Sequence, residues 1–365
     1  MKTKLVGINR LRIRPNDAEM KIYRDILTYN NIPYVMLDSS EPGFWEKVTE
    51  LDYFIFKWGH DNLSFQVATS VLPVIENYLK IKCFPNYSTC WHYDDKIKQY
   101  LLLKQCGFPV VDSFVFWDRK RALEWIDGFD NFPLVFKLKN GAGSMSVFLV
   151  PSKRKALKLI NKMFGAGYLQ SKVSFKHLAR TCNYDINTIF RYYTINFRNK
   201  YLIPEKQQFW LRHKNYIFFQ KFLPNNEWDT RVTTAGNRAH AFRRFNREND
   251  FRASGSNRWD INPDKIDTRM VRIALNISKH FGFQGMAYDF LYDENKEPKI
   301  VEISYLYGGA GYPDFMNGYW DENLVWYEGR FWPQYFELMD LLNIPDLKLP
   351  ELETTTSYKK ANILS

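Results

Sequence analysis

The sequence has few cysteines and no long apolar run. Its four cysteines, Cys83, Cys90, Cys106 and Cys182, show neither CxxC spacing nor a pattern of metal ligands, so we expect reduced thiols in a reducing compartment. No stretch approaches the roughly 20 apolar residues of a membrane span. The opening segment "MKTKLVGINRLRI" lacks the continuous apolar core and small-residue cleavage site of a signal peptide. We therefore expect a cytoplasmic protein.

Positive charge exceeds negative charge in this chain. It has 51 Lys and Arg against 40 Asp and Glu, a net charge of +11, and 17% aromatic residues. Such a charge favours anionic partners, although it also serves solubility alone. The basic residues do not concentrate in one helix or tail, and no RNA-recognition motif is present. A basic nucleic-acid-binding protein therefore stays only as a second alternative.

Strands and helices alternate over residues 1–90. The segments "KLVGIN", "PYVMLD" and "DYFIFKWG" are typical of strands, and "DAEMKIYRDILTYNNI" has apolar residues at helical spacing. Another helix is expected from Phe44 to Thr49. This order predicts a small parallel sheet. Because open sheets bind ligands at their strand ends, Trp58 and His60 are candidate ligand positions.

The next segments predict further helices and a hairpin. "DDKIKQYLLLKQCGFPVV" predicts a helix that starts near Asp94 and stops at Gly107. "FPLVFKLKNGAGSMSVFLV" predicts a strand, a turn and a strand, and "SKRKALKLINKMF" an amphipathic helix. The chain is then strand-rich from "YIFFQKFL" onward, interrupted by the helix "DTRMVRIALNISKHFGF". That helix would carry one apolar stripe, formed by Met270, Ile273, Ala274, Ile277 and Phe281.

Two acids lie in the strand-like segment "GMAYDFLYDENKEPKIVEIS". If Asp293 faces Pro298 across the turn, then Asp289 faces Glu302, with Ile300 on the same side. Cross-strand Cβ atoms are about 5 Å apart, and like charges there repel each other. A divalent cation bound to substrate phosphate would resolve the repulsion. Salt bridges to arginines, or a shifted register, would resolve it equally well.

The loop "KLKNGAGSMS" has glycines that let its backbone N–H groups approach phosphate oxygens. It lacks the G-K-[ST] ending of a Walker A loop, and an ordinary hairpin turn explains it as well. Lys137 lies inside the apolar strand before it. An unpaired ammonium there would be costly, so we expect a phosphate or carboxylate partner.

The segment from Trp228 to Ser254 is rich in arginine. Alternation in "TRVTTAGNRAHAFRRF" predicts a hairpin with some guanidinium groups facing one cavity, where they can bind phosphate or carboxylate in a bidentate manner. The alternative is a solvated basic face, which we expect for Arg238 and Arg247. The six arginines are Arg231, Arg238, Arg243, Arg244, Arg247 and Arg252.

Taken in order, these pieces resemble the ATP-grasp superfamily, above all its branch of ribosomal-protein glutamate ligases and related carboxylate–amine ligases. The resemblance covers about residues 85 to 306 and rests on five segments in the right order. These are "DDKIKQYLLLKQCGFPV", "FPLVFKLKNGAGSMSVFLV", "YIFFQKFLPNNEWDTRV", "AFRRFNRENDFRAS" and "GMAYDFLYDENKEPKIVEIS". Each segment is loose by itself, but the five together are fairly specific.

The resemblance implies an α/β (α+β) chain with the ATP-grasp fold. We expect an N-terminal parallel-sheet domain over residues 1–90 and an ATP-grasp domain over residues 91–348. The latter would contain a lid at about residues 133–222 and a C-terminal antiparallel sheet. A flexible tail would follow over residues 349–365.

The resemblance also implies nucleotide-binding residues. Lys96 and Lys137 would contact the phosphates of ATP, and the loop with Gly141, Gly143 and Ser144 would close over them. The adenine would meet a hinge, mostly through backbone groups. That hinge consists of Gln220, Lys221, Phe222 and Leu223.

Further residues match the reacting end of the nucleotide site. Asp229 would serve the ribose or bind a neighbouring arginine, and Ser254 would face phosphate. Arg244 and Arg252 would be catalytic, stabilising charge on the transferred phosphoryl group. Asp289 and Glu302 match ligands of Mg²⁺ or Mn²⁺, and the hydroxyl of Ser304 would also bind the metal, directly or through a water. Three departures stand out: Ser304 and Ser254 each replace a usual Asn, and Lys221 replaces a common acid.

The implied reaction joins a carboxylate and an amine through an acyl phosphate. The span from Lys137 to Gln220 is long and contains a basic, aromatic segment over residues 165–216. Its part around Arg191 to Lys214 would help to bind an extended anionic acceptor such as an acidic sugar, glycan or peptide. Extra lid packing is the alternative. The run "SYLYGGAGYPDFMNGYW" is another acceptor-site candidate. An ATP-grasp kinase or phosphotransferase remains the first alternative function.

Overall fold

The computed structural model describes residues 4–9, 18–59, 62–141, 147–169, 212–256, 258–307, 316–352 and 362–363. Contacts within the chain divide it into two compact units. The terminal unit consists of residues 1–59, 64–112 and 221–365, and the inserted unit of residues 60–63 and 113–220. Within the described residues, no helix is long and apolar enough to cross a membrane.

The terminal unit begins with the predicted parallel sheet, whose strand order is β2-β1-β3-β4. Its elements are β1 (Val6–Asn9), α1 (Ala18–Tyr29), β2 (Tyr34–Leu37), α2 (Phe44–Val48), β3 (Tyr53–Ile55), α3 (Asn62–Asn77) and β4 (Lys82–Phe84). The predicted strands and helices of this region are confirmed. Trp58, however, is buried against Tyr93 and Tyr305, so its ring belongs to the core. His60 lies outside the described residues.

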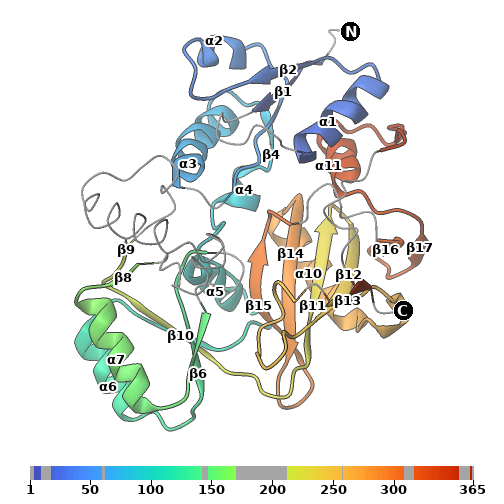
Figure 1. The fold of residues 1–365 in the computed structure, drawn as a ribbon. Helices are drawn as coiled ribbons and strands as arrows, with labels where there is room; N and C mark the ends of the chain where they lie inside the picture. Colours follow the sequence, from blue (N-terminus) through green and yellow to red (C-terminus); the bar gives the residue numbers. More distant parts are fainter. Residues whose placement is uncertain are drawn as a thin grey trace, which may run out of the picture. The chain divides into compact units, whose positions relative to one another are not determined.

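The terminal unit also contains a second, mostly antiparallel sheet (Figure 1). Its order is β15-β14-β11-β12-β13-β18, and β16 pairs with β12 and β17. The strands are β11 (Trp228–Ala235), β12 (Arg238–Phe245), β13 (Arg258–Asp260), β14 (Gly285–Tyr292), β15 (Pro298–Ser304), β16 (Gly318–Trp320), β17 (Trp326–Glu328) and β18 (Asn362–Ile363). The last strand comes from the end of the predicted tail and pairs in parallel with β13.

The helix α10 (Thr268–Phe281) covers one face of this sheet. Asp267 caps its first turn, and Gly282 ends it in the left-handed conformation at φ +66°. Met270 and Ala274 of its predicted apolar stripe are fully buried in one core with Tyr288 of β14. Other helical elements among the described residues of this unit are α4 (Tyr87–Cys90), α5 (Lys96–Gln105), the short 3₁₀ helix η2 (Pro263–Lys265) and α11 (Pro333–Leu342).

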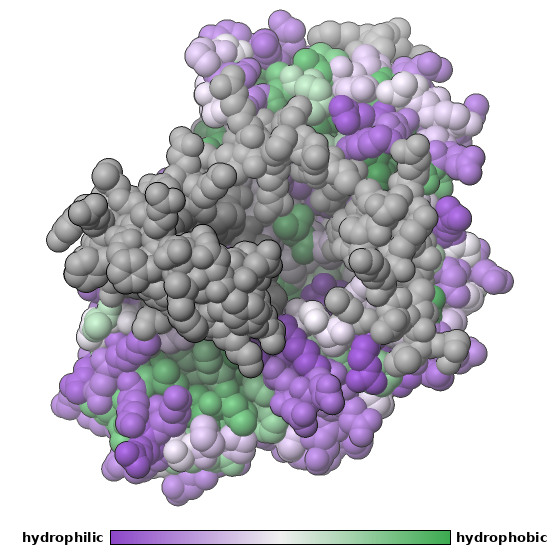
Figure 2. Space-filling view, in the orientation of Figure 1, coloured by the Kyte–Doolittle hydropathy of each residue, from purple (hydrophilic) through white to green (hydrophobic). Residues whose placement is uncertain are grey.

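The inserted unit carries a four-stranded sheet of order β5-β10-β6-β7 and a small pair, β8-β9. Its elements are β5 (Ser113–Phe116), α6 (Arg119–Asp127), β6 (Leu134–Lys137), β7 (Val147–Val150), α7 (Lys153–Phe164), β8 (Tyr168–Leu169), β9 (Arg212–His213) and β10 (Ile217–Lys221). The predicted hairpin and amphipathic helix are thereby confirmed. Hydrophobic residues gather on this unit over the part where β6 and β10 lie (Figure 2). Residues 170–211 of the basic, aromatic segment lie outside the described residues.

The chain enters and leaves the inserted unit at neighbouring points. β5 and β10 are antiparallel, and Gln220 lies opposite Ser113. The next residue, Lys221, donates its backbone N–H to the carbonyl oxygen of Asp112 at 2.8 Å. The predicted lid, residues 133–222, thus overlaps a compact unit that begins earlier, at Ser113. The lid role itself stays a prediction.

Candidate functional site

A row of charged residues crosses three neighbouring strands of the large sheet. Arg231 on β11 pairs with Asp289 on β14, and Asp289 pairs with Glu302 on β15. The predicted facing of the two acids is therefore confirmed. In the next row, Asp229 pairs with Arg244 of β12. Because successive strand residues alternate between faces, these residues lie on the face opposite to α10.

A β-bulge adjusts the register beside the two acids. Tyr292 pairs with Pro298, and the register shifts between Asp289 and Phe290. The turn is one residue longer than the predicted one, and the bulge restores the expected pairing further along. Ile300 consequently pairs with Phe290 and is fully buried in the core with α10. Its predicted place beside the acids is wrong, because one extra residue on a strand reverses the faces beyond it.

Asp289 is bound by two arginines. Its Oδ1 accepts from Arg231 Nε at 2.7 Å, and its Oδ2 accepts from Arg231 Nη2 at 2.9 Å. Arg244 Nη2 also reaches Oδ2 at 2.8 Å. Burial alone would raise the pKa of Asp289, but Arg231 and Arg244 outweigh it and hold that pKa well below its usual range. Asp289 is therefore a stable anion in this arrangement.

Arg244 bridges two carboxylates. Its Nε and Nη2 each bind Asp229 at 2.7 Å, while Nη2 also binds Asp289. The Arg244 side chain is only 8% exposed, and those of Asp229 and Asp289 are 14% and 13% exposed. Burial would lower the pKa of Arg244, but the two carboxylates raise it. Of the two predicted roles for Asp229, binding to a neighbouring arginine matches this geometry.

Glu302 has a different partner, Lys96 at the start of α5. The Lys96 ammonium lies 3.1 Å from Glu302 Oε1, and its side chain is 3% exposed. Burial would lower the pKa of Lys96, but Glu302 and Asp94 outweigh burial and raise it. Lys96 thus brings a permanent positive charge to the outer end of the charged row.

The donor set as it lies does not fit a resident divalent cation. Both oxygens of Asp289 accept hydrogen bonds from guanidinium groups, and Ser304 donates its hydroxyl to the carbonyl oxygen of Leu306 at 2.8 Å. In the part of the chain that the structure describes, no three His, Cys, Asp or Glu side chains are grouped to hold a metal ion. The assignment of Asp289, Glu302 and Ser304 as metal ligands stays a prediction.

The loop after β12 holds Arg252 and Ser254. Arg252 binds Asp250, with Nη2 2.6 Å from Oδ2. The carbonyl oxygen of Ser254 accepts from Arg247 Nε at 2.7 Å, so Arg247 is a partly buried tie of this loop and not a solvated residue. Arg238, likewise expected in solvent, pairs with Asp340. The phosphate-facing roles of Arg252 and Ser254 stay predictions.

The predicted hinge is held by side-chain and backbone contacts. Lys221 pairs with Glu294 at 2.7 Å, and Leu223 is buried. Asn226, which the sequence did not single out, donates to the carbonyl oxygens of Leu223 and Tyr292 at 3.3 and 2.9 Å. These bonds hold the end of the hinge in place. In the sequence, the only sign of this role is that an asparagine follows shortly after the hinge residues.

Two further hinge residues have contacts of their own. The ring of Phe222 lies edge-on to Phe251, with centroids 5.7 Å apart, so the hinge touches the loop that carries Arg252. Gln220, in the inserted unit, donates its side-chain amide to Ser113 Oγ at 3.1 Å.

Part of the predicted phosphate loop is described in the inserted unit. Lys137 ends β6 opposite Val147 and is 6% exposed. Gly141 has a φ of +113°, a conformation that favours glycine. Gly143 and Ser144 lie outside the described residues, so the predicted closing of this loop over phosphates stays a prediction.

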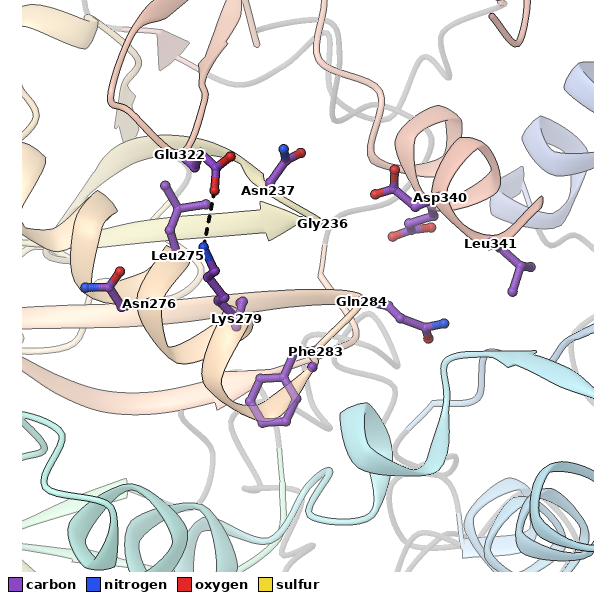
Figure 3. Close-up of a pocket in the computed structure, with 13 residues that line it drawn as sticks. Gly236, Asn237, Leu275, Asn276, Lys279, Phe283, Gln284, Glu322, Asp340 and Leu341 are labelled. Atoms are coloured by element: carbon purple, nitrogen blue, oxygen red, sulfur yellow. Dashed lines mark ion pairs between the residues drawn. The ribbon is translucent and has the colours of Figure 1, made fainter. Parts of the chain in front are cut away.

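A separate cavity of about 410 Å³ lies in the terminal unit, at the end of the large sheet (Figure 3). It is lined by the turn at Gly236 and Asn237, by the end of α10 and by α11. Lys279 and Glu322 form an ion pair there at 3.5 Å. Among the described residues, none of those predicted for the site lines this cavity.

A buried charge cluster joins the parallel sheet to α11. Glu337 is 0% exposed and accepts hydrogen bonds from the hydroxyls of Tyr23 and Tyr307. The ammonium of Lys57, just after β3, lies 3.7 Å from the same carboxylate. The sequence indicated none of these partners. They satisfy one another, so the cluster is a structural tie.

These two units, with a parallel N-terminal sheet and a large antiparallel sheet that carries the charged row, have the ATP-grasp fold. One similar solved structure is N5-carboxyaminoimidazole ribonucleotide synthetase from Thermotoga maritima, with a TM-score of 0.54 and 13% identity over 96% of this chain and 78% of that chain. The Staphylococcus aureus N5-carboxyaminoimidazole synthetase matches with a TM-score of 0.53 and 11% identity, over 96% and 80% of the two chains.

A third similar structure is the ATP-grasp ligase PsnB complexed with precursor peptide PsnA2 and AMPPNP. Its TM-score is 0.51 and its identity 13%, over 87% of this chain and 94% of that chain. No protein-family model and no curated protein matches this sequence. At these identities the similarity establishes the fold, which the sequence had predicted.

Proposed function

We propose that this protein is an ATP-dependent carboxylate–amine ligase that forms an amide through an acyl phosphate. One observation carries the proposal: Arg231, Asp289 and Glu302 lie in one row across the sheet of an ATP-grasp fold, with Arg244 and Lys96 beside them. Such a concentration of paired charges on one sheet face is unusual for a packed core. It is suited to binding the charged groups of a nucleotide and a carboxylate.

The proposed reaction has two steps. A carboxylate oxygen of the substrate attacks the γ-phosphorus of ATP, and the bond to the bridging oxygen breaks to release ADP. The nitrogen of the amine then attacks the acyl carbon, loses a proton, and phosphate leaves as the amide forms. Positioning and charge stabilisation dominate such transfers, so little acid–base chemistry is required of side chains.

Four basic residues have a place in this proposal. The Arg244 guanidinium, oriented by Asp229, would bind the transferred phosphoryl group and later the oxyanion of the tetrahedral intermediate. Arg252 would bind the same phosphoryl group from its loop, once its guanidinium has left Asp250. Lys96 and Lys137 would bind phosphate oxygens, and backbone groups of residues 220–223 would meet the adenine.

For the acceptor, we favour a peptide carboxylate among the acidic sugars, glycans and peptides that the sequence suggests. Support comes from the PsnB structure, in which the fold is complexed with a precursor peptide. The net charge of +11 is compatible with an acidic peptide.

The test is a turnover assay with ATP, Mg²⁺ or Mn²⁺, and a panel of acidic peptides, acidic sugars and amino acids, in which ADP, phosphate and the coupled product are each measured. We expect ADP and phosphate in equal amounts together with a new amide. Glu302→Gln and Asp289→Asn should each lower the rate by about 10²-fold, the size typical for loss of one group that stabilises charge at a reacting centre. Asp340→Asn removes an acid of α11 that pairs with Arg238, and it serves as the matched control with an unchanged rate.

The assay also separates the alternatives. ADP with a stable phosphorylated product, and no free phosphate, would identify a kinase or phosphotransferase. Salt-dependent DNA or RNA binding without ADP formation would identify a binding protein. Wild-type turnover by Asp289→Asn would refute the site.

A further inference from the structure

A short chain of hydrogen bonds in the inserted unit ends at the predicted phosphate loop. Its members are His213 of β9, Tyr216 just before β10, and the backbone of Lys139, two residues after β6. The backbone N–H of Lys139 donates to the Tyr216 hydroxyl at 3.0 Å, and the same hydroxyl lies 2.9 Å from His213 Nδ1. Tyr216 and His213 are only 4% and 3% exposed, so little water competes for these bonds.

The donors and acceptors of this chain match one another. Because the Tyr216 hydroxyl accepts from Lys139, its own hydrogen is available for a further acceptor. Neutral His213 with its proton on Nε2 offers Nδ1 as that acceptor. His213 therefore orients the hydroxyl, and the hydroxyl holds the N–H of Lys139.

The backbone around Tyr216 fixes the place of its hydroxyl. Asn215 has a left-handed conformation at φ +62°, and its N–H donates to the carbonyl oxygen of Met163 in α7 at 2.9 Å. Ile217, the residue after Tyr216, begins β10 opposite Phe116 of β5. Tyr216 thus lies between a bond to a helix and a paired strand, so its hydroxyl is a fixed point within the inserted unit.

Lys139 lies beyond the paired part of β6. Lys137 pairs with Val147 of β7, the last described pair before the loop, and Gly141 then turns the chain at φ +113°. A backbone N–H beyond the ladder needs another acceptor, and Lys139 finds it in the side chain of Tyr216. The path of the chain from β6 to Gly141 is therefore set in part by this hydroxyl.

We propose that Tyr216 is a positioning residue for nucleotide binding. Its hydroxyl, oriented by His213, holds Lys139 so that the Lys137 ammonium and the backbone of Gly141 are in place for the phosphates of ATP. This inference rests on the proposed function, because it takes this loop as the phosphate loop. The hydrogen-bond chain then contributes to the affinity for the phosphates and not to the affinity for the adenosine part, which residues 220–223 would bind.

The test compares the affinities for a non-hydrolysable ATP analogue and for adenosine, both measured by isothermal titration calorimetry in buffer with Mg²⁺. Tyr216→Phe keeps the ring and removes the hydroxyl, so the N–H of Lys139 loses its acceptor. We expect the affinity for the analogue to fall about 10-fold, the effect of losing one typical hydrogen bond, and the affinity for adenosine to change less than about twofold. A general weakening of the inserted unit would instead lower both affinities.

Tyr168→Phe is the matched control in the same unit. The ring of Tyr168 lies beside Phe136 and Phe148, and within the described residues its hydroxyl makes no hydrogen bond. Removing that hydroxyl should leave both affinities unchanged. Circular dichroism and the thermal midpoint check that each variant is folded.

A second variant tests whether His213 acts through Tyr216. His213→Phe alone should lower the affinity for the analogue about threefold, because the hydroxyl keeps the N–H of Lys139 but loses its own acceptor. In the Tyr216→Phe background it should add nothing, since the two substitutions break the same chain. Hydrogen–deuterium exchange, measured without nucleotide, should be faster in Tyr216→Phe for the peptide that contains Lys139.

Four results would overturn the inference: equal affinity of folded Tyr216→Phe and wild type for the analogue, an equal fall for adenosine, additive effects of the two substitutions, or unchanged exchange at Lys139. Failure of the ligase panel with analogue binding intact would remove the proposed reaction alone. Absence of analogue binding by the wild type would contradict both proposals.

Discussion

Replacing Arg244 by methionine should strongly destabilise the protein at neutral pH. Methionine keeps much of the volume of the side chain but removes the cation that Asp229 and Asp289 share. All three side chains are at most 14% exposed, so water cannot replace the lost partner. The variant isolates the contribution of one guanidinium to the charged row.

The magnitude follows from the burial. A charge pair 4 Å apart is worth about 4 kcal/mol at an effective dielectric constant of 20, and breaking a buried pair from one side costs about 3–5 kcal/mol. We expect the free energy of unfolding at pH 7 to fall by about that amount. Replacing Asp229 alone by asparagine in the same variant should recover much of the loss, because Asp289 keeps Arg231 as its partner and no buried charge is then left unpaired.

The pH dependence has a definite sign. In the wild type the pKa of Asp289 is depressed, so its stabilising contribution is present above the unfolded-state pKa of about 3.9 and is lost as pH falls toward the folded-state value. Burial already raises the pKa of Asp229 in the wild type, and without Arg244, which opposes that effect, this pKa rises further. The variant therefore gains stability as pH falls toward about 4, whereas Asp289 keeps Arg231 as a partner that lowers its pKa. The difference between the two proteins should shrink between pH 7 and pH 4.

Urea unfolding followed by tryptophan fluorescence at pH 7 and pH 4 measures both quantities. A loss below about 1 kcal/mol at pH 7 would mean that water reaches the pair and that it behaves as a surface ion pair. An equal loss at both pH values would refute the electrostatic reasoning and indicate lost packing instead.

Two other substitutions test the packing of the terminal unit. Gly285→Ala would place a Cβ atom 2.4 Å from the hydroxyl of Tyr307, and it should lower the free energy of unfolding in urea by about 1–3 kcal/mol. The loss should be smaller when Tyr307 is replaced by phenylalanine, and equal losses in both backgrounds would contradict the clash. His92 is fully buried, its ring nitrogens have no hydrogen-bond partner within the described residues, and burial lowers its pKa to about 3. His92→Phe should therefore leave the thermal midpoint unchanged or raise it, because a buried unsatisfied polar group costs about 1–3 kcal/mol. A clear drop in the midpoint would mean that the imidazole stabilises the protein.

Local patterns predicted most elements and the central pairing of the site. The assumed turn, with Asp293 facing Pro298, placed Asp289 opposite Glu302, and this pairing is correct because the bulge compensates for a turn that is one residue longer. The sequence pattern could not predict the bulge, because the two possible turns differ by one residue and only packing against α10 selects between them. Salt bridges from arginines to Asp289 were only one of several predicted ways to offset the repulsion between the acids. Alternation along a strand predicts the face on which a side chain lies, but it does not predict its partner.

Contacts between distant parts of the sequence were out of reach. Tyr23 and Glu337 are 314 positions apart and meet only because α11 packs beside the parallel sheet. Lys57 lies in the aromatic run "DYFIFKWG", where nothing nearby in sequence suggests an acid. Such pairs are set by topology, and a single sequence contains no local pattern for them.

The side-by-side placement of Ser113 and Gln220 has a consequence for how this chain can vary in length. The chain leaves the terminal unit before Ser113 and returns to it after Gln220, at two neighbouring points. The length of the segment between these two residues therefore does not change where the chain rejoins that unit. Doubling a closed loop costs only about 0.6 kcal/mol in chain entropy. Evolution can therefore lengthen or shorten the segment between these two residues, including its basic and aromatic stretch, without disturbing the sheet that carries the charged row.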